Sequence, residues 1–218
     1  MSRAVLTISS KNYSSWSLRG YLLCKLAKLD FAEQFVSLDD PSNRAELLLL
    51  APSVLVPRLS HDGASVWDTL AIAEYLDETF PKTNMLPTDR IARAHCRSIS
   101  GEIHAGFHNL RSALPMNLKA KHTNFKIFAG AQPDIDRIQA IWGECLERWG
   151  GPFLFGRNPS IADAMYAPVC TRFLTYSVKM SDPVRGYCDT IMAWPPMKEW
   201  VDAALAEPED MEELDVEF

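Results

Sequence analysis

The segment from Val56 to Leu76 constrains the fold of this chain more than any other stretch of its sequence. It reads as a strand, a turn at 61–63, a second strand and then an amphipathic helix. Asp68 and Thr69 stand where this helix begins. Unpaired backbone N–H groups and the positive end of the helix dipole make such a position favourable for an anion. The segment therefore predicts a binding site for a carboxylate.

A proline opens the first strand of this segment. Pro57 has no N–H to give to a sheet, and it permits a cis peptide bond with Val56. The N–H and C=O of Val56 are then free to pair with an extended, peptide-like ligand. Together with the carboxylate site, this pattern predicts a peptide that carries a carboxylate.

The charge of the chain is concentrated at its end. The formal net charge is -6, but seven of the 28 acidic residues follow Ala206, which leaves 21 acids against 22 lysines and arginines. A nearly neutral body argues against a nucleic-acid surface. We expect the acidic tail to be solvated or loosely docked, and we predict no chemical role for it.

The remaining composition indicates a globular protein of the cytoplasm. With 218 residues, 47% of them hydrophobic, the chain can bury the core of one large or two small domains. No apolar run is long enough for a signal peptide or a membrane span, so we expect a cytoplasmic location and no membrane partner. The five cysteines are an odd number and show no Cys-x-x-Cys pair, so we expect reduced, mostly buried thiols.

The first part of the chain alternates strand and helix patterns. We expect a strand at 5–8, a helix at 14–28, a strand at 31–38 and a helix at 39–50, followed by the unit that begins at Val56. The order βαβ and then ββα predicts a small mixed sheet with helices on both faces.

The second part of the chain carries helical patterns and no strand pattern. We expect a domain over residues 1–81, a linker at 82–87 and an all-helical domain over 88–218. The predicted helices are a long one through 99–114 that ends at Pro115, one at 135–149, one that opens at a Ser160–Asp163 capping box, and one at 195–205.

Three motifs occur in a characteristic order. They are NYSSWSLR at 12–19, the Val-Pro pair with Asp68-Thr69, and FLFG at 153–156 leading to SIAD at 160–163. A chain with these motifs resembles the cytosolic glutathione transferase family over essentially its whole length, with a serine-type, zeta- or tau-like first motif. The resemblance implies a thioredoxin-like N-terminal domain, an all-helical C-terminal domain, a homodimer and glutathione as co-substrate with a hydrophobic electrophile.

The resemblance also implies which hydroxyl activates the glutathione thiol. Ser14 is the first candidate and Ser15 the second, because they begin the first helix directly after the first strand. Tyr13 is a competing hydroxyl, since other classes of the family use a tyrosine near this strand end. The alternative is that Ser14 only caps the helix, as serine very often does.

The glutathione contacts follow from the same resemblance. Thr69 would bind the γ-glutamyl carboxylate and Asp68 the ammonium group, although both residues can also be plain helix caps. The full predicted set is Ser14, Ser15, Trp16, Val56, Pro57, Asp68 and Thr69. The electrophile would lie between the loop at 10–16 and the region 107–117.

The residue at position 16 bears on which of two activities the chain is expected to have. It stands where the zeta-class maleylacetoacetate isomerases, which the motif resembles, have a cysteine. We therefore predict conjugation of the glutathione thiolate to an electrophilic small molecule. The alternatives are a zeta-like glutathione-dependent isomerase and a non-catalytic ligand-binding or protein-interaction module.

Two histidines have the spacing of a zinc helix. His104 and His108 are four residues apart on the predicted 99–114 helix, but no third ligand accompanies them in a known pattern. We expect solvated or interface histidines, and we predict no metal.

Overall fold

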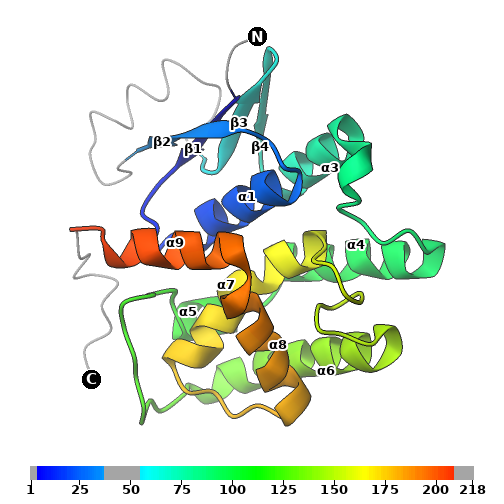
Figure 1. Ribbon diagram of the computed structural model, residues 1–218. Helices are drawn as coiled ribbons and strands as arrows, with labels where there is room; N and C mark the ends of the chain where they lie inside the picture. Colours follow the sequence, from blue (N-terminus) through cyan, green and yellow to red (C-terminus); the bar gives the residue numbers. More distant parts are fainter. Residues whose placement is uncertain (1–3, 37–54, 209–218) are drawn as a thin grey trace.

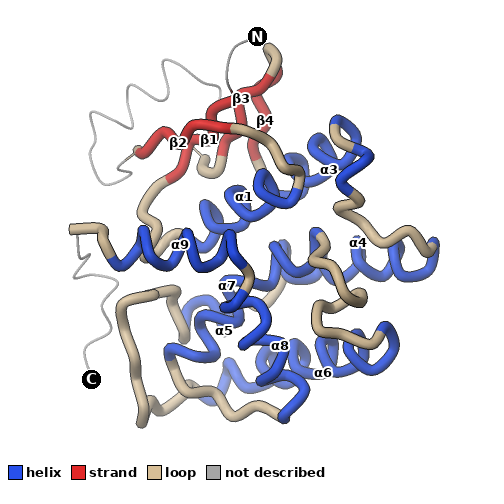
Figure 2. Tube along the Cα trace, in the orientation of Figure 1, coloured by secondary structure: helices blue, strands red, loops and turns tan. Residues whose placement is uncertain are grey.

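The chain begins with a small sheet and continues as a layer of packed helices. The structure is a computed structural model that describes residues 4–36 and 55–208. Figure 1 shows the sheet at one end of the molecule, with α9 running beside α1 and the other late helices beyond it. Figure 2 shows that the strands gather at this one end. Within the described ranges, no helix is both long enough and apolar enough to cross a bilayer.

The sheet has four strands in the described part of the chain. They are β1 Ala4–Ile8, β2 Phe31–Phe35, β3 Arg58–His61 and β4 Ala64–Trp67. Their order is β2-β1-β3-β4, with β1 parallel to β2 and the other two pairs antiparallel. The parallel pair needs a crossover, which α1 (Ser15–Leu26) provides. The predicted mixed sheet is confirmed, while the predicted helix at 39–50 lies outside the described residues.

Short connections join the last two strands to each other and to the helix that follows them. Asp62 and Gly63 join β3 to β4 with φ of 46° and 83°, the left-handed conformations that a two-residue hairpin requires. Helix α3 (Thr69–Thr79) follows β4 directly. Strand, turn, strand and helix therefore occur as the sequence predicts.

Helices make up the second part of the described chain. They are α4 Arg90–Ala105, α5 His108–Ala113, α6 Gln132–Trp149, α7 Ile161–Thr175, α8 Asp182–Ala193 and α9 Pro195–Leu205, with 3-10 turns η1 Pro81–Thr83 and η2 Ala129–Ala131. Helices α6, α7 and α9 match the predicted segments. Helix α8 was not predicted, although Val184, Tyr187 and Ile191 give it a buried stripe at helical spacing. The predicted linker at 82–87 begins inside η1 and ends before α4.

The predicted long helix through 99–114 is wrong, because it breaks into α4 and α5. Gly106 ends α4, and a Cβ atom at this position would lie 2.8 Å from the Glu102 carbonyl oxygen. Phe107 then takes a left-handed φ of 61°. The Arg111 guanidinium donates to the Ile103 and His104 carbonyls and so satisfies the exposed end of α4. His104 therefore does not share one continuous helix with His108.

Helix α7 forms the centre of the helical part and is anchored by a buried carboxylate. Asp163 is fully buried and accepts hydrogen bonds from the Ser160 N–H (2.7 Å), the Ser160 hydroxyl (2.8 Å), the Leu154 N–H (3.0 Å) and the Tyr187 hydroxyl (3.1 Å). Burial raises the pKa of Asp163, and these donors oppose the rise. The predicted capping box is confirmed. Its carboxylate also ties α7 to the 150–156 turn and to α8.

Replacing Asp163 by Ala should destabilise the protein severely. Four donors lose their acceptor, and all four belong to residues that are fully or almost fully buried, so we expect a loss of about 3 kcal/mol or more in the free energy of unfolding. Urea unfolding followed by circular dichroism measures this loss. Asp182→Ala at the exposed first turn of α8 is the matched control, and it should cost about 1 kcal/mol or less. Equal losses in the two variants would contradict the anchoring role of Asp163.

Candidate functional site

A cavity of about 290 Å³ lies between the sheet part and the helical part. Its lining comprises Trp16, Leu55, Val56, Pro57, Asp68, Thr69 and His104. Five of the seven predicted site residues are in this set, and they come from three separate segments of the chain. A larger cavity of about 700 Å³ lies among α7, α8, α9 and the loop at 118–121, and none of the predicted residues lines it.

The Val56–Pro57 segment lies directly against α1. The peptide bond between the two residues is cis. Gly20 faces Pro57, and a Cβ atom at Gly20 would lie 2.5 Å from the Pro57 Cβ, so only glycine allows this close approach. The β3 ladder begins at Arg58, so Val56 lies outside it. The backbone of Val56 therefore borders the cavity without a partner strand.

The N-terminus of α3 forms one wall of the cavity. Asp68 caps the helix, and its Oδ1 accepts from the Leu70 N–H (2.8 Å) and the Ala71 N–H (3.3 Å). The backbone of Asp68 has a φ of 75°, a conformation that a non-glycine residue adopts only where its surroundings hold it. The predicted cap geometry is present, and Oδ2 takes no part in the capping bonds.

His104 completes this wall from the helical part. Its Nε2 lies 3.1 Å from the Asp68 Oδ2, and its Nδ1 lies 3.3 Å from the Thr69 Oγ1. One ring thus contacts both residues of the predicted carboxylate site, and Thr69 is almost fully buried. The sequence led us to expect a solvated or interface histidine at His104. No pattern could reveal its position, because α4 reaches α3 only through the tertiary fold.

The two serines lie at the start of α1, next to the cavity but not in its lining. The Ser14 hydroxyl accepts from the Ser17 N–H (3.2 Å) and lies 2.9 Å from the Ser17 Oγ, to which it donates. The hydroxyl of Ser15, the first residue of α1, has no hydrogen-bond partner among the described residues. Ser14 is therefore a helix cap by its geometry. Its role toward a thiol, and that of Ser15, stay predictions.

Trp16, in the first turn of α1, lines the cavity and contacts two arginines. The guanidinium carbons of Arg19 and Arg111 lie 4.6 Å and 4.8 Å from the Trp16 ring centroid. The His104 ring meets the same indole edge-on, with centroids 5.3 Å apart. Such cation–π contacts hold the indole in place. Arg111 belongs to the region 107–117 that was predicted to face the electrophile.

The guanidinium groups near Trp16 have no acidic partner among the described residues. Arg19 is almost fully buried and donates from Nε to the Met165 carbonyl (2.7 Å). Burial lowers the pKa of Arg19, and the charges of Arg111 and Arg172 lower it further. Arg172 donates to the carbonyls of Arg111 and Leu114 at the end of α5. This group of arginines keeps the wall behind Trp16 positively charged.

The described residues supply neither a metal cluster nor an activated thiol. No group of three or more His, Cys, Asp or Glu within them is arranged to hold a metal ion. All five cysteines are buried and free, and burial raises the pKa of Cys24, Cys96 and Cys145 to about 12. Nucleophilic sulfur chemistry at this cavity would need a thiol from a bound molecule.

Sequence comparison identifies the family. The model of the glutathione S-transferase N-terminal domain matches residues 13–79, and the model of the C-terminal domain matches residues 125–203. The chain belongs to the glutathione S-transferase family. Its relatives include a probable maleylacetoacetate isomerase of Caenorhabditis elegans, 31% identical over 72% of this chain and 73% of that protein. The maleylacetoacetate isomerase of Rattus norvegicus is 30% identical over 62% of both chains.

Solved structures show the same glutathione S-transferase fold. A glutathione transferase homologue from Burkholderia, crystallised with bound glutathione, has a TM-score of 0.70 and 25% identity and covers 94% of this chain and 100% of that chain. A maleylacetoacetate isomerase from Anaeromyxobacter dehalogenans, also with bound glutathione, has a TM-score of 0.66 and 21% identity over 95% of this chain and 97% of that chain. Both the thioredoxin-like and the helical parts are therefore those of a glutathione S-transferase.

The residues of this chain fit glutathione. The cavity is near the lower end of the volumes that small-molecule sites show. The free backbone at Val56 suits the extended main chain of a tripeptide, and the α3 terminus with Asp68 suits its charged end. The cationic wall behind Trp16 adds a second region for an anionic group.

Replacing Asp68 by Asn should weaken glutathione binding and leave the fold intact. Asn still caps a helix, so only the charge at the cavity and its pairing with His104 are lost. Loss of a charge-assisted bond of about 1.5–3 kcal/mol predicts a KM for glutathione raised roughly ten- to a hundredfold. Steady-state kinetics and calorimetry measure this change.

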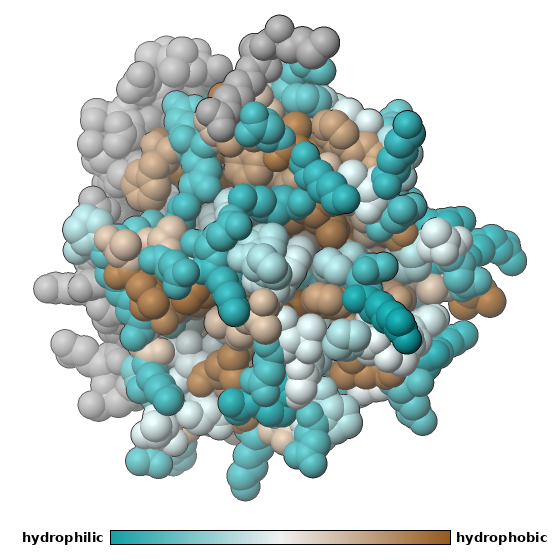
Figure 3. Space-filling view, viewed as in Figure 1, coloured by the Kyte–Doolittle hydropathy of each residue, from teal (hydrophilic) through white to brown (hydrophobic). Residues whose placement is uncertain are grey.

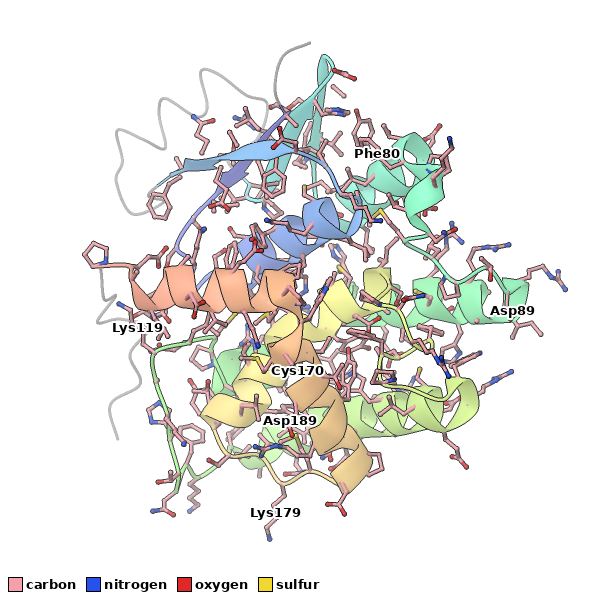
Figure 4. All side chains as sticks on the ribbon, in the orientation of Figure 1. Phe80, Asp89, Lys119, Cys170, Lys179 and Asp189 are labelled. Carbon is pink, nitrogen blue, oxygen red and sulfur yellow. The ribbon has the colours of Figure 1, made fainter. Side chains whose placement is uncertain are left out.

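Asp89→Asn is the matched control for this experiment. Asp89 caps α4 with the same geometry, accepting from the Ile91 N–H (3.0 Å) and the Ala92 N–H (2.8 Å), but it does not line the cavity. Figure 4 shows Asp89 at the far end of α4. Unchanged glutathione affinity in Asp68→Asn would mean that Asp68 is only a cap.

Proposed function

We propose that this chain is a glutathione transferase that adds the glutathione thiolate to an electrophilic carbon of a small molecule bound beside Trp16. The supporting observation is the convergence of Trp16, Val56, Pro57, Asp68 and Thr69 on one cavity. The backbone of Val56 pairs with the glutathione main chain. Asp68 and Thr69 bind the γ-glutamyl end, and His104 fixes the side chains of both.

A hydroxyl at the start of α1 activates the thiol in this proposal. A free thiol with a pKa of about 8.5 is only about 3% ionised at pH 7, and lowering the pKa by about two units needs about 2.7 kcal/mol. A helix N-terminus supplies about 0.3–1 kcal/mol, and a hydroxyl bond to an ionised group about 1.5–3 kcal/mol. The two together are sufficient, and α1 offers both at Ser14 and Ser15.

The hydrogen bonds of the two serines differ. Ser14 must release the Ser17 hydroxyl before it can donate to a thiolate, but it lies at the cap where the dipole acts. Ser15 has a hydroxyl that no described residue engages. Ser14 is the first candidate and Ser15 the second, and substitution distinguishes them.

A glutathione-dependent isomerisation is the second candidate function. Several relatives are named maleylacetoacetate isomerase, and maleylacetoacetate is an unsaturated carboxylate anion. The thiolate would add to the C=C bond and the electron pair would move to a conjugated carbonyl. Rotation about the new single bond and expulsion of the thiolate would complete the isomerisation. The guanidiniums of Arg19 and Arg111 each keep one nitrogen, Nη1 of Arg19 and Nε of Arg111, without a partner among the described residues, and they favour such an anion because arginine recognises carboxylates.

Glutathione binding and thiol stoichiometry test these functions together. We expect calorimetry to detect micromolar to millimolar binding, and we expect one thiol to disappear for each product formed in a screen of electrophiles. With maleylacetoacetate as the probe, turnover without loss of total thiol would favour the isomerase instead. No heat and no thermal shift at about 10 mM glutathione would contradict both functions, because even weak binding stabilises the folded state.

Ser14→Ala should lower turnover more than it weakens glutathione binding. The lost hydroxyl bond is strongest to the thiolate, so the pKa of the bound thiol should rise. We expect kcat to fall roughly ten- to a hundredfold at neutral pH and to recover partly at alkaline pH, where the thiol ionises unaided. The pH-rate profile measures this directly.

Two further variants locate the activating hydroxyl. A damaging Ser15→Ala with a silent Ser14→Ala would assign the role to Ser15. If both serine variants are silent and Tyr13→Phe is damaging, the serine-type activation is wrong.

The assembly proposed for this enzyme is a homodimer. We propose that the contact involves the segments 68–76 and 90–110. Trp67, directly before the first segment, and Ile91, in the second, are exposed at 38% and 57% in the single chain. Figure 3 shows one face of the molecule, where hydrophilic residues predominate and apolar residues form only small patches.

A further inference from the structure

The chain turns back after α9 and contacts the loop that leads into α1. We call residues 9–14 the serine loop, because it ends at Ser14. The Glu207 carboxylate accepts three hydrogen bonds from this loop: from the Ser10 hydroxyl (2.9 Å), the Lys11 N–H (2.6 Å) and the Asn12 N–H (3.1 Å). Glu207 is the first of the seven tail acids, for which the sequence predicted no chemical role.

Ser10 relays this contact to Ser14. While its hydroxyl donates to Glu207, the Ser10 Oγ accepts from the Asn12 N–H (3.2 Å) and the Tyr13 N–H (3.3 Å). The Ser10 carbonyl accepts from the Ser14 N–H at 3.0 Å. A hydrogen-bonded path therefore runs from the Glu207 carboxylate through Ser10 to the backbone of Ser14.

The helical part holds the same loop at two further points. The Asn12 side-chain oxygen accepts from the Leu118 N–H (2.7 Å) and the Lys119 N–H (3.1 Å). Trp200 on α9 donates from its indole to the Lys11 carbonyl (2.9 Å). The Lys119 ammonium group donates to the Glu207 carbonyl (2.7 Å), and Figure 4 shows Lys119 beside the C-terminal end of α9.

Water can replace these contacts only in part. Asn12 is completely buried and Ser10 is 6% exposed. Buried N–H groups that lose their acceptor remain unpaired or force the backbone to rearrange. Because the donors lie in consecutive residues, loss of the carboxylate would affect the loop at three adjacent positions. The conformation of the serine loop thus depends on Glu207, which lies 197 positions after Ser10 in the sequence.

We propose that Glu207 is a positioning residue for thiol activation. Its carboxylate fixes the serine loop and thereby the placement of the Ser14 and Ser15 hydroxyls relative to the glutathione thiol. This inference rests on the proposed function. A residue that only stabilised the end of α9 would leave the pKa of the bound thiol unchanged, because that pKa depends on the placement of the donors.

The experiment compares Glu207→Gln and Glu207→Ala with the wild-type protein. Ultraviolet difference titration of the bound glutathione gives the thiol pKa, steady-state kinetics give kcat and KM, and thermal unfolding gives Tm. We expect the thiol pKa to rise in both variants, more in Ala than in Gln, because Gln keeps one acceptor oxygen. We expect kcat at neutral pH to fall about tenfold, with partial recovery at alkaline pH and a KM for glutathione within about twofold.

Asp202→Asn is the control. Asp202 is an exposed acid on α9 whose side chain has no partner among the described residues, so this variant removes the same charge from the same end of the chain. It should leave the thiol pKa, kcat and Tm unchanged. If Glu207→Ala does not fold, Glu207→Gln carries the comparison.

The outcomes separate the positioning role from the proposed function. A wild-type protein that leaves the bound thiol at its solution pKa overturns thiol activation, and the positioning role with it. A wild-type protein that lowers the thiol pKa, with Glu207 variants that lower it equally, overturns the positioning role alone. A lower Tm with an unchanged thiol pKa also overturns it, because Glu207 is then only structural.

Discussion

The burial of α1 along its length from Ser17 to Cys24 is the constraint on which the rest of this structure depends. Leu18, Leu22 and Leu23 have no exposed surface, and even Arg19 is 2% exposed. A helix whose middle two turns are covered on every side cannot shift without disturbing both the sheet and the helical part. Its cap Ser14 and its first residues, Ser15 and Trp16, are therefore held at the boundary where the cavity lies. The close approach of Gly20 and Pro57 fixes the opposite wall against the same helix.

Polar contacts across the boundary join the two parts of the chain. Arg19 donates to the Met165 carbonyl, Trp200 to the Lys11 carbonyl, and the Tyr21 hydroxyl to the Glu199 carboxylate (2.9 Å). Burial raises the pKa of Tyr21, and its bond to Glu199 raises it further. The hydroxyl therefore stays protonated and can donate. The site is assembled between two parts that are fixed to one another by these bonds.

The cavity combines contributions that differ in chemistry. The sheet part supplies a free backbone segment, two helix N-termini and the hydroxyls. The helical part supplies cations and aromatic contacts through His104 and Arg111. A tripeptide thiol suits the first set, and an electrophile suits the second. Trp16 lies between them, so the identity of this one residue affects both the thiol region and the electrophile region.

The sequence by itself determined the features that depend on neighbouring residues. The strand-turn-strand-helix unit, the helix caps at Ser14 and Asp68 and the Asp163 capping box are all encoded within a few positions. Periodicity and capping preferences act at this range, and they also predicted most helices and the mixed sheet. The family motifs work in the same way, which is why the glutathione S-transferase fold could be predicted.

Only the tertiary structure decided which distant residues complete the site. His104 contacts Thr69 across 35 positions, and Glu207 contacts Ser10 across 197. The sequence did not predict the break between α4 and α5, because the apolar residues keep helical spacing on both sides of Gly106 although the helix ends there. The helix ends in spite of this spacing, because Gly106 terminates it and Arg111 donates to the carbonyls left free at its end. Such contacts depend on how whole helices pack, so the local sequence around one partner does not indicate which distant residue it will contact.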